Sequence, residues 1–125
     1  MTENERDIAA LQGDWVQVSL EADGVIDPPD TYGVDLCTTF TGDRFRVHAP
    51  DGTVVLAGSF TLDAATTPRS ITWTDAMGED AGKSLLAIYE LAGDSFVFVA
   101  ASPGDPRPTT FRTTHGQTLR RFVRR

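Results

Sequence analysis

Residues 84–101 read SLLAIYELAGDSFVFVAA, two runs of apolar, β-branched and aromatic residues on either side of Gly93-Asp94. A Gly-Asp pair suits a two-residue type II′ turn, and such a turn decides which residues of the two strands lie opposite each other. The stretch therefore predicts a hairpin of strands 84–92 and 95–101. In this hairpin Tyr89 lies opposite Phe98 on one side of the sheet, and Glu90 lies opposite Val97 on the other.

The same turn chemistry recurs earlier in the chain, at Gly42-Asp43 and Asp51-Gly52. Counting outward from these turns predicts further cross-strand pairs, namely Phe40 with Phe45, Phe45 with Gly58, Val47 with Leu56 and Cys37 with His48. One face of the sheet then collects most of the large apolar side chains and is predicted to be the interior. Its members are Phe40, Phe45, Val47, Leu56, Phe60, Tyr89, Leu91, Phe96 and Phe98.

The whole pattern predicts an all-β fold, an eight-stranded and mainly antiparallel barrel with a short N-terminal helix. The predicted strands are 14–21, 35–41, 44–48, 53–62, 69–75, 84–92, 95–101 and 117–124. Thr2 and Glu5 match a capping box, which indicates a helix over residues 4–10. With 125 residues the chain is expected to be one domain, 1–125, and the long loop 22–33 is expected to border the open end of the barrel.

Composition argues against several kinds of partner. The formal charge of −7 at pH 7 predicts no nucleic-acid partner, because phosphate binding needs a basic face. No run approaches a membrane span and the start lacks an apolar signal core, so we expect a cytoplasmic protein with no membrane partner. Cys37 is the single cysteine. The last strand interleaves apolar residues with four arginines, which favours a solvated strand face over an anion-binding patch: Arg120, Arg121, Arg124 and Arg125.

Strand 14–21 conflicts with simple alternation. If Trp15 points inward, Gln17 and Ser19 also point inward, and the apolar residues Val16, Val18 and Leu20 point outward. Either the strand has a bulge after Trp15, or the lumen carries Gln17 as a polar group and the outward residues are covered by the helix or a partner subunit. We favour the second explanation. The outward face of strands 84–92 and 95–101 is also apolar, and a homodimer would cover such a face.

Five blocks of the sequence, taken in order, resemble a family of small bacterial lipocalin-like domains, best known as an uncharacterised planctomycete domain. The blocks are LQGDW (11–15), FTGDRF (40–45), GSFTLD (58–63), GKSLLAIYEL (82–91) and PRPTTF (106–111). The resemblance covers nearly the whole chain and implies an eight-stranded calycin-type barrel, without an agreed activity. It further implies that a tryptophan of the first strand plugs the closed end against an arginine of the last strand. By position these are Trp15 and either Arg121 or Arg120.

Motifs of known chemistry are absent from the sequence. It contains no phosphate-binding glycine loop, paired-cysteine motif or nucleophile elbow, and we expect no metal and no cofactor. His48 lies beside Cys37 in the predicted register, but the pair falls on the outer face, which favours a structural role over a zinc or nucleophilic one. His115 is expected to be an exposed loop residue. Asp75 and Glu90 are acid/base candidates, although the register exposes Glu90 and solvated carboxylates are the commoner case.

Tyr89 is the strongest functional candidate. Its phenol is predicted to lie inside an apolar lumen, where it could donate a hydrogen bond to a ligand or act in catalysis, and a core tyrosine satisfied by a backbone carbonyl is the equal alternative. The predicted ligand-binding residues are Gln17, Phe45, Val47, Leu56, Phe60, Trp73, Tyr89 and Phe98.

Three functions stay open on this evidence. The first is binding of an apolar or aromatic small molecule in the lumen. The second is a cofactor-free cyclase or isomerase of natural-product biosynthesis that uses the same lumen as a shaped cavity. The third is a filled barrel that acts as a protein-interaction module through its outer surface.

Overall fold

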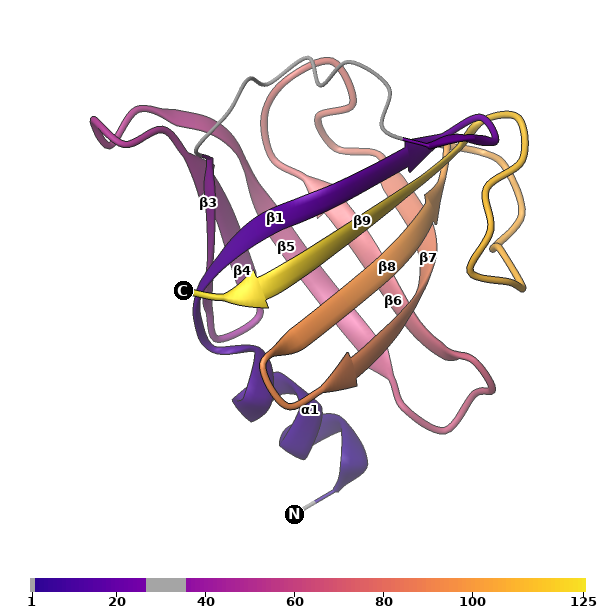
Figure 1. The fold of residues 1–125 in the computed structure, drawn as a ribbon, viewed down its shortest axis with the longest axis horizontal. Coiled ribbons are helices and arrows are strands. Elements are labelled where there is room, and N and C mark those ends of the chain that lie inside the picture. The colour runs from indigo at the N-terminus through magenta and orange to yellow at the C-terminus, as the bar shows by residue number, and fades with distance from the viewer. Residues whose placement is uncertain (1, 27–35) are drawn as a thin grey trace.

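The computed structural model describes residues 2–26 and 36–125, and in them it shows a closed antiparallel barrel with one helix across an end (Figure 1). The elements are α1 (Glu3–Leu11), β1 (Gly13–Ala22), β2 (Val25–Ile26), β3 (Cys37–Thr41), β4 (Arg44–His48), β5 (Val54–Asp63), β6 (Arg69–Asp75), β7 (Ser84–Ala92), β8 (Ser95–Ala101) and β9 (Gln117–Arg124). Strands β3 to β9 pair in order, and β1 pairs with both β3 and β9, which closes the barrel. The predicted fold class is confirmed, with the short β2 as an addition.

The tight turns produce the predicted register. Phe40 lies opposite Phe45, Val47 opposite Leu56, Tyr89 opposite Phe98 and Cys37 opposite His48. The turn glycines Gly42 and Gly93 have φ values of 60° and 59°, while the aspartates after them are not in the positive-φ region. This is the type II′ pattern, which matches the twist of the flanking strands.

A bulge in β1 resolves the conflict in that strand. The pairing of β1 with β9 shifts between Gln17 and Ser19, so Val18 is the inserted residue and its side chain is 58% exposed. An inserted residue reverses the facing of the side chains that follow it. Gln17 precedes the inserted residue and points into the lumen as predicted, whereas Leu20 follows it, turns inward and is buried. The bulge is therefore the correct explanation, and the favoured outward position of Leu20 is wrong.

The outward apolar face of β7 and β8 is covered by the chain itself. Ile88, Val97, Val99 and Leu119 form a second buried cluster, and Phe111 from the β8–β9 connection packs against it. Arg107 holds this connection in place by donating hydrogen bonds to the carbonyl oxygens of β6 and β7 at 3.0 and 2.6 Å. The outward apolar face that suggested a homodimer is therefore covered by residues of the same chain.

Helix α1 and Trp15 close one end of the barrel. Thr2 caps α1 by accepting a hydrogen bond from the Glu5 backbone, as the capping box predicted. The Trp15 side chain is fully buried, and its indole N–H donates to the Leu11 carbonyl oxygen at 2.7 Å. Figure 1 shows α1 beneath this end, with the β6–β7 connection at the opposite end.

The arginine that covers Trp15 is Arg124, not Arg121 or Arg120. Its guanidinium carbon lies 4.3 Å from the Trp15 ring centroid, and its Nη atoms donate to carbonyl oxygens at the end of α1. A cation is well placed there, because a helix C-terminus carries unpaired carbonyls and partial negative charge. Arg121 is exposed on the outer face, and Arg120 lines the lumen. The β1–β9 register, which sets Trp15 opposite Arg124, explains the difference.

Candidate functional site

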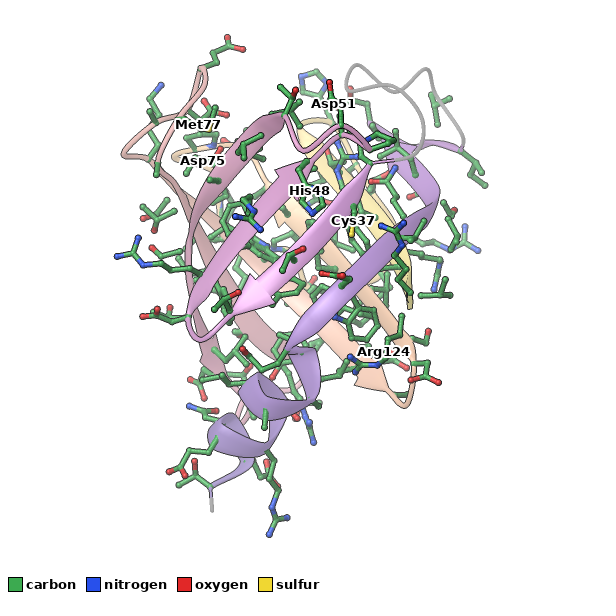
Figure 2. All side chains as sticks on the ribbon, turned by 90° about the vertical axis from the view of Figure 1, so that its left-hand side faces the viewer. Cys37, His48, Asp51, Asp75, Met77 and Arg124 are labelled. Carbon is green, nitrogen blue, oxygen red and sulfur yellow. The ribbon has the colours of Figure 1, made fainter. Side chains whose placement is uncertain are left out.

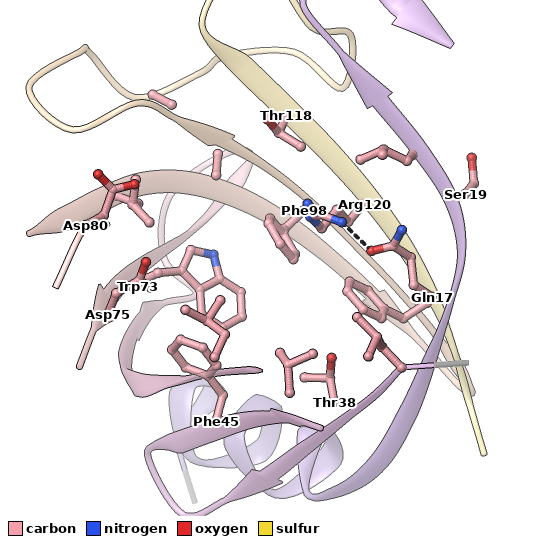
Figure 3. Close-up of a pocket in the computed structure, with 18 of the residues that line it drawn as sticks. Gln17, Ser19, Thr38, Phe45, Trp73, Asp75, Asp80, Phe98, Thr118 and Arg120 are labelled. Atoms are coloured by element: carbon pink, nitrogen blue, oxygen red, sulfur yellow. Dashed lines mark hydrogen bonds between the residues drawn. The ribbon is translucent and has the colours of Figure 1, made fainter. Parts of the chain in front are cut away.

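A cavity of about 640 Å³ occupies the barrel at the end away from α1 (Figure 3). Its rim includes residues of the β6–β7 and β8–β9 connections, among them Asp80 and Pro103. The apolar part of its lining includes Phe40, Phe45, Val47, Leu56, Trp73, Leu85, Phe98 and Phe122, and the polar part includes Gln17, Thr38, Asp75, Asp80, Thr118 and Arg120. The predicted border loop 22–33 lies mostly outside the described residues.

Six of the eight predicted lining residues surround this cavity, namely Gln17, Phe45, Val47, Leu56, Trp73 and Phe98. Phe60 and Tyr89 do not. Both are buried deeper, among the aromatic rings that fill the closed half of the barrel around Phe40 and Phe96. Strand parity predicts that a side chain points inward, but it does not predict how far along the barrel axis the packed core ends.

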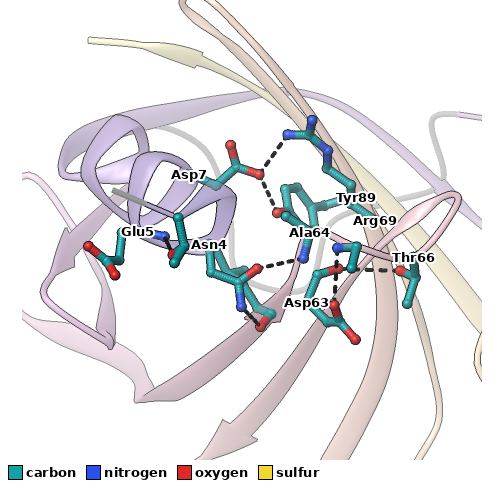
Figure 4. Close-up of polar contacts among 11 residues, drawn as sticks. Asn4, Glu5, Asp7, Asp63, Ala64, Thr66, Arg69 and Tyr89 are labelled. Carbon is teal, nitrogen blue, oxygen red and sulfur yellow. Dashed lines mark hydrogen bonds and ion pairs between the residues drawn. The ribbon is translucent and has the colours of Figure 1, made fainter.

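Tyr89 belongs to a polar cluster that holds α1 against the barrel (Figure 4). Its hydroxyl donates a hydrogen bond of 2.5 Å to Asp7 Oδ2, and Arg69 Nη1 donates to the same oxygen at 2.8 Å. Burial, followed by the interaction with Asp7, raises the pKa of Tyr89 above its ordinary value. The candidate catalytic role is therefore corrected, because the hydroxyl is used by the helix and not by the lumen.

Tyr89→Phe is expected to lower the free energy of unfolding by about 1 kcal/mol, the usual net value of one hydrogen bond, since Asp7 keeps its pairing with Arg69. The affinity for any lumen ligand should stay within about twofold of wild type. Urea denaturation and a ligand titration on the same protein measure both quantities. A large loss of ligand affinity with an unchanged free energy of unfolding would show that the Tyr89 hydroxyl contributes to the lumen site.

Asp75, at the end of β6, is a carboxyl group that lines the cavity. It follows Trp73 by two residues and so shares its inward face, and its side chain is buried. Its carboxylate accepts no hydrogen bond from the described residues, and Asp80 lines the same cavity. Burial first and then repulsion from Asp80 raise the pKa of Asp75. Parity with Trp73 was the sequence signal that could have singled it out.

Trp73 contributes an aromatic ring to the cavity wall. Phe45 stands edge-on to its ring, with centroids 5.1 Å apart at 87°, and Phe98 packs against it in a tilted contact, with centroids 4.8 Å apart at 51°. Its indole nitrogen is buried without a hydrogen-bond partner in the described part of the chain. A buried donor left unpaired costs about 1–3 kcal/mol, and native proteins rarely keep one without a reason.

The opposite wall carries the basic group of the lumen. Arg120 lies opposite Phe98 and Leu20 in the sheet, and its Nη1 donates to Gln17 Oε1 at 2.6 Å. Figure 3 shows Gln17 and Arg120 on one side of the cavity and Asp75 and Asp80 on the other. The site is therefore electrically asymmetric, with its apolar rings between the two charged sides.

Cys37 and His48 are neighbours on the outer face of β3 and β4, as the register predicted (Figure 2). His48 Nε2 lies 3.1 Å from Thr39 Oγ1, which donates to Asp14 at 2.7 Å. Cys37 is buried. Within residues 2–26 and 36–125, no group of three or more histidine, cysteine, aspartate or glutamate side chains is arranged to hold a metal ion.

No family model, curated protein or solved structure matches this chain. No helix in the described part of the chain is long and apolar enough to cross a membrane.

Proposed function

We propose that this protein binds an apolar or aromatic small molecule in the lumen of the barrel. The observation that carries the proposal is the cavity of about 640 Å³. Its volume lies within the range of small-molecule sites, which are mostly apolar pockets with a few placed polar groups. Trp73, Phe45 and Phe98 supply aromatic surfaces, while Gln17 and Asp75 supply polar contacts.

The filled end of the barrel supports a deep site that opens away from α1. Trp15, Leu11 and the rings around Phe96 fill the end beneath α1. The open end lies among connections rather than strands, where insertions and substitutions change specificity without disturbing the sheet. A flat ligand entering there would replace water against the rings of Trp73 and Phe98, a favourable change at roughly 25 cal/mol per Å² of apolar surface.

A cofactor-free cyclase or isomerase is the second candidate, and Asp75 is the observation that favours it. A buried carboxyl group with a raised pKa is a candidate acid or base when it faces a largely apolar cavity. The third reading, a filled barrel acting through its surface, is less well supported because the lumen holds open space. Membership of the lipocalin-like family, a cytoplasmic location and a homodimer remain predictions.

Ala100→Phe is expected to weaken binding of the neutral fluorescent probe N-phenyl-naphthylamine at least about tenfold, because Ala100 lines the cavity and a ring there fills it. The matched control is Ala92→Phe, which adds the same ring at an exposed position on the neighbouring strand β7 and should bind within about twofold of wild type. Fluorescence titration measures both. Equal probe affinity in the two variants, or no saturable binding by wild type, would contradict the proposal.

A further inference from the structure

The Asp75 carboxylate is a buried group for which the protein supplies no counter-charge among the described residues. Only 8% of the residue is exposed, and neither a hydrogen bond nor an ion pair reaches its side chain there. Lys83, the nearest basic residue in the following connection, lies 4.0 Å from Asp80 and is itself exposed. Since an isolated buried charge is unfavourable, a ligand that brings a cation to Asp75 would gain an interaction that the empty site lacks.

The cavity wall beside Asp75 also suits a cation attached to a ring. Trp73 is on the same strand face, and Phe45 stands edge-on to it with centroids 5.1 Å apart. Indole and phenyl faces attract ammonium groups, most strongly where water is excluded.

The charge of the protein favours the same class of ligand. Asp75 and Asp80 both line the cavity on one side, and the chain carries a formal charge of −7. A negative protein with acidic groups at a cleft attracts cations and repels anions. Arg120, the basic group of the lumen, lies on the other side and donates a hydrogen bond to Gln17. The acidic and basic sides would therefore contact different parts of a bound molecule.

From this geometry we infer that the ligand of the lumen is an aromatic amine, bound with its ammonium group at Asp75 and its ring against Trp73 and Phe45. The inference rests on the proposed function, because it names the class of small molecule that the cavity takes. It also orients the ligand, with its charged end toward β6 and the β6–β7 connection.

Three probes that share one ring and differ in their head groups test this inference: naphthylethylamine, naphthylethanol and naphthylacetate, titrated by calorimetry at neutral pH. Wild type should prefer the amine to the alcohol by at least about tenfold and should bind the carboxylate most weakly. Asp75→Asn keeps the size of the side chain and removes its charge. It should reduce amine affinity about tenfold, to the level of the alcohol, and leave alcohol affinity within about twofold.

Glu90→Gln is the control, because Glu90 is an exposed carboxylate on the outer face of β7 and its loss should leave all three affinities unchanged. The head-group comparison on wild type decides the matter even if Asp75→Asn fails to fold. Equal binding of the three probes overturns the amine inference but keeps the proposed function, provided that Ala100→Phe weakens their binding at least about tenfold. Binding of none of them, and of no neutral probe, overturns both.

Discussion

Gly58→Ala is expected to destabilise the barrel by about 3 kcal/mol or more, which is a large share of the stability of a domain of this size. A Cβ atom at Gly58 would lie 2.1 Å from the Thr74 carbonyl oxygen and 2.9 Å from Phe45 Cε1. The first of these contacts is with backbone, which cannot rotate away. The strands β5 and β6 would have to separate where Gly58 lies opposite Asp75.

Gly52→Ala is the control for that experiment. Gly52 has a φ of 89° and nothing within 4 Å of its Cβ position, so the change costs about 1 kcal/mol of backbone strain and no steric overlap. Urea denaturation of both variants measures the difference. A Gly58→Ala protein as stable as Gly52→Ala would show that the packing of the Phe45 ring does not depend on the absence of a side chain at position 58.

Trp15→Ala is expected to lower the free energy of unfolding by about 3–5 kcal/mol, the range for deleting a large buried aromatic side chain. Trp15 is 0% exposed, and its indole N–H is hydrogen-bonded to Leu11. The variant would lose the ring on which Arg124 lies and the contact that joins α1 to the barrel. We expect the loss to appear as a lower midpoint in thermal and urea unfolding.

The two tryptophans provide a matched comparison for that result. Trp15→Phe removes a satisfied hydrogen bond, whereas Trp73→Phe removes an N–H that has no partner in the described residues. Trp15→Phe should therefore cost more stability than Trp73→Phe. The reverse order would mean that the indole group of Trp73 contributes more to stability than the hydrogen-bonded indole group of Trp15 does.

Local turn chemistry explains why so much of the fold could be predicted. The Gly-Asp turns at 42 and 93 determine the pairing of β3 with β4 and of β7 with β8, and parity then assigns Phe45 and Phe98 to the interior. The bulge at Val18 had a weaker signal, because the broken alternation of β1 fitted either a bulge or a polar lumen, and the bulge was the explanation not favoured. The choice of Arg124 depended on the register of β1 with β9, a pairing between the first and last strands that no tight turn determines.

The sequence predicted which side chains face the lumen, but it did not predict how much of the lumen is open space. Parity placed Phe60 and Tyr89 in the lumen with Trp73, but the depth at which the packed rings end is set by how α1 docks. The Asp7 contact to Tyr89 joins residues 82 positions apart, and nothing in the periodicity of the strands reveals it. Asp75 was predicted only as an acid/base candidate, and its isolation depends on which neighbours reach it in three dimensions.

The two indole N–H signals of the protein test the central proposal most directly, because one marks the closed end and the other marks the cavity wall. A proton–nitrogen correlation spectrum recorded during titration with N-phenyl-naphthylamine should show the Trp73 signal moving in a saturable way. The Trp15 signal, hydrogen-bonded to Leu11 beneath α1, should stay in place. A Trp73 signal that does not move at saturating probe, or equal movement of both signals, would contradict binding in the lumen.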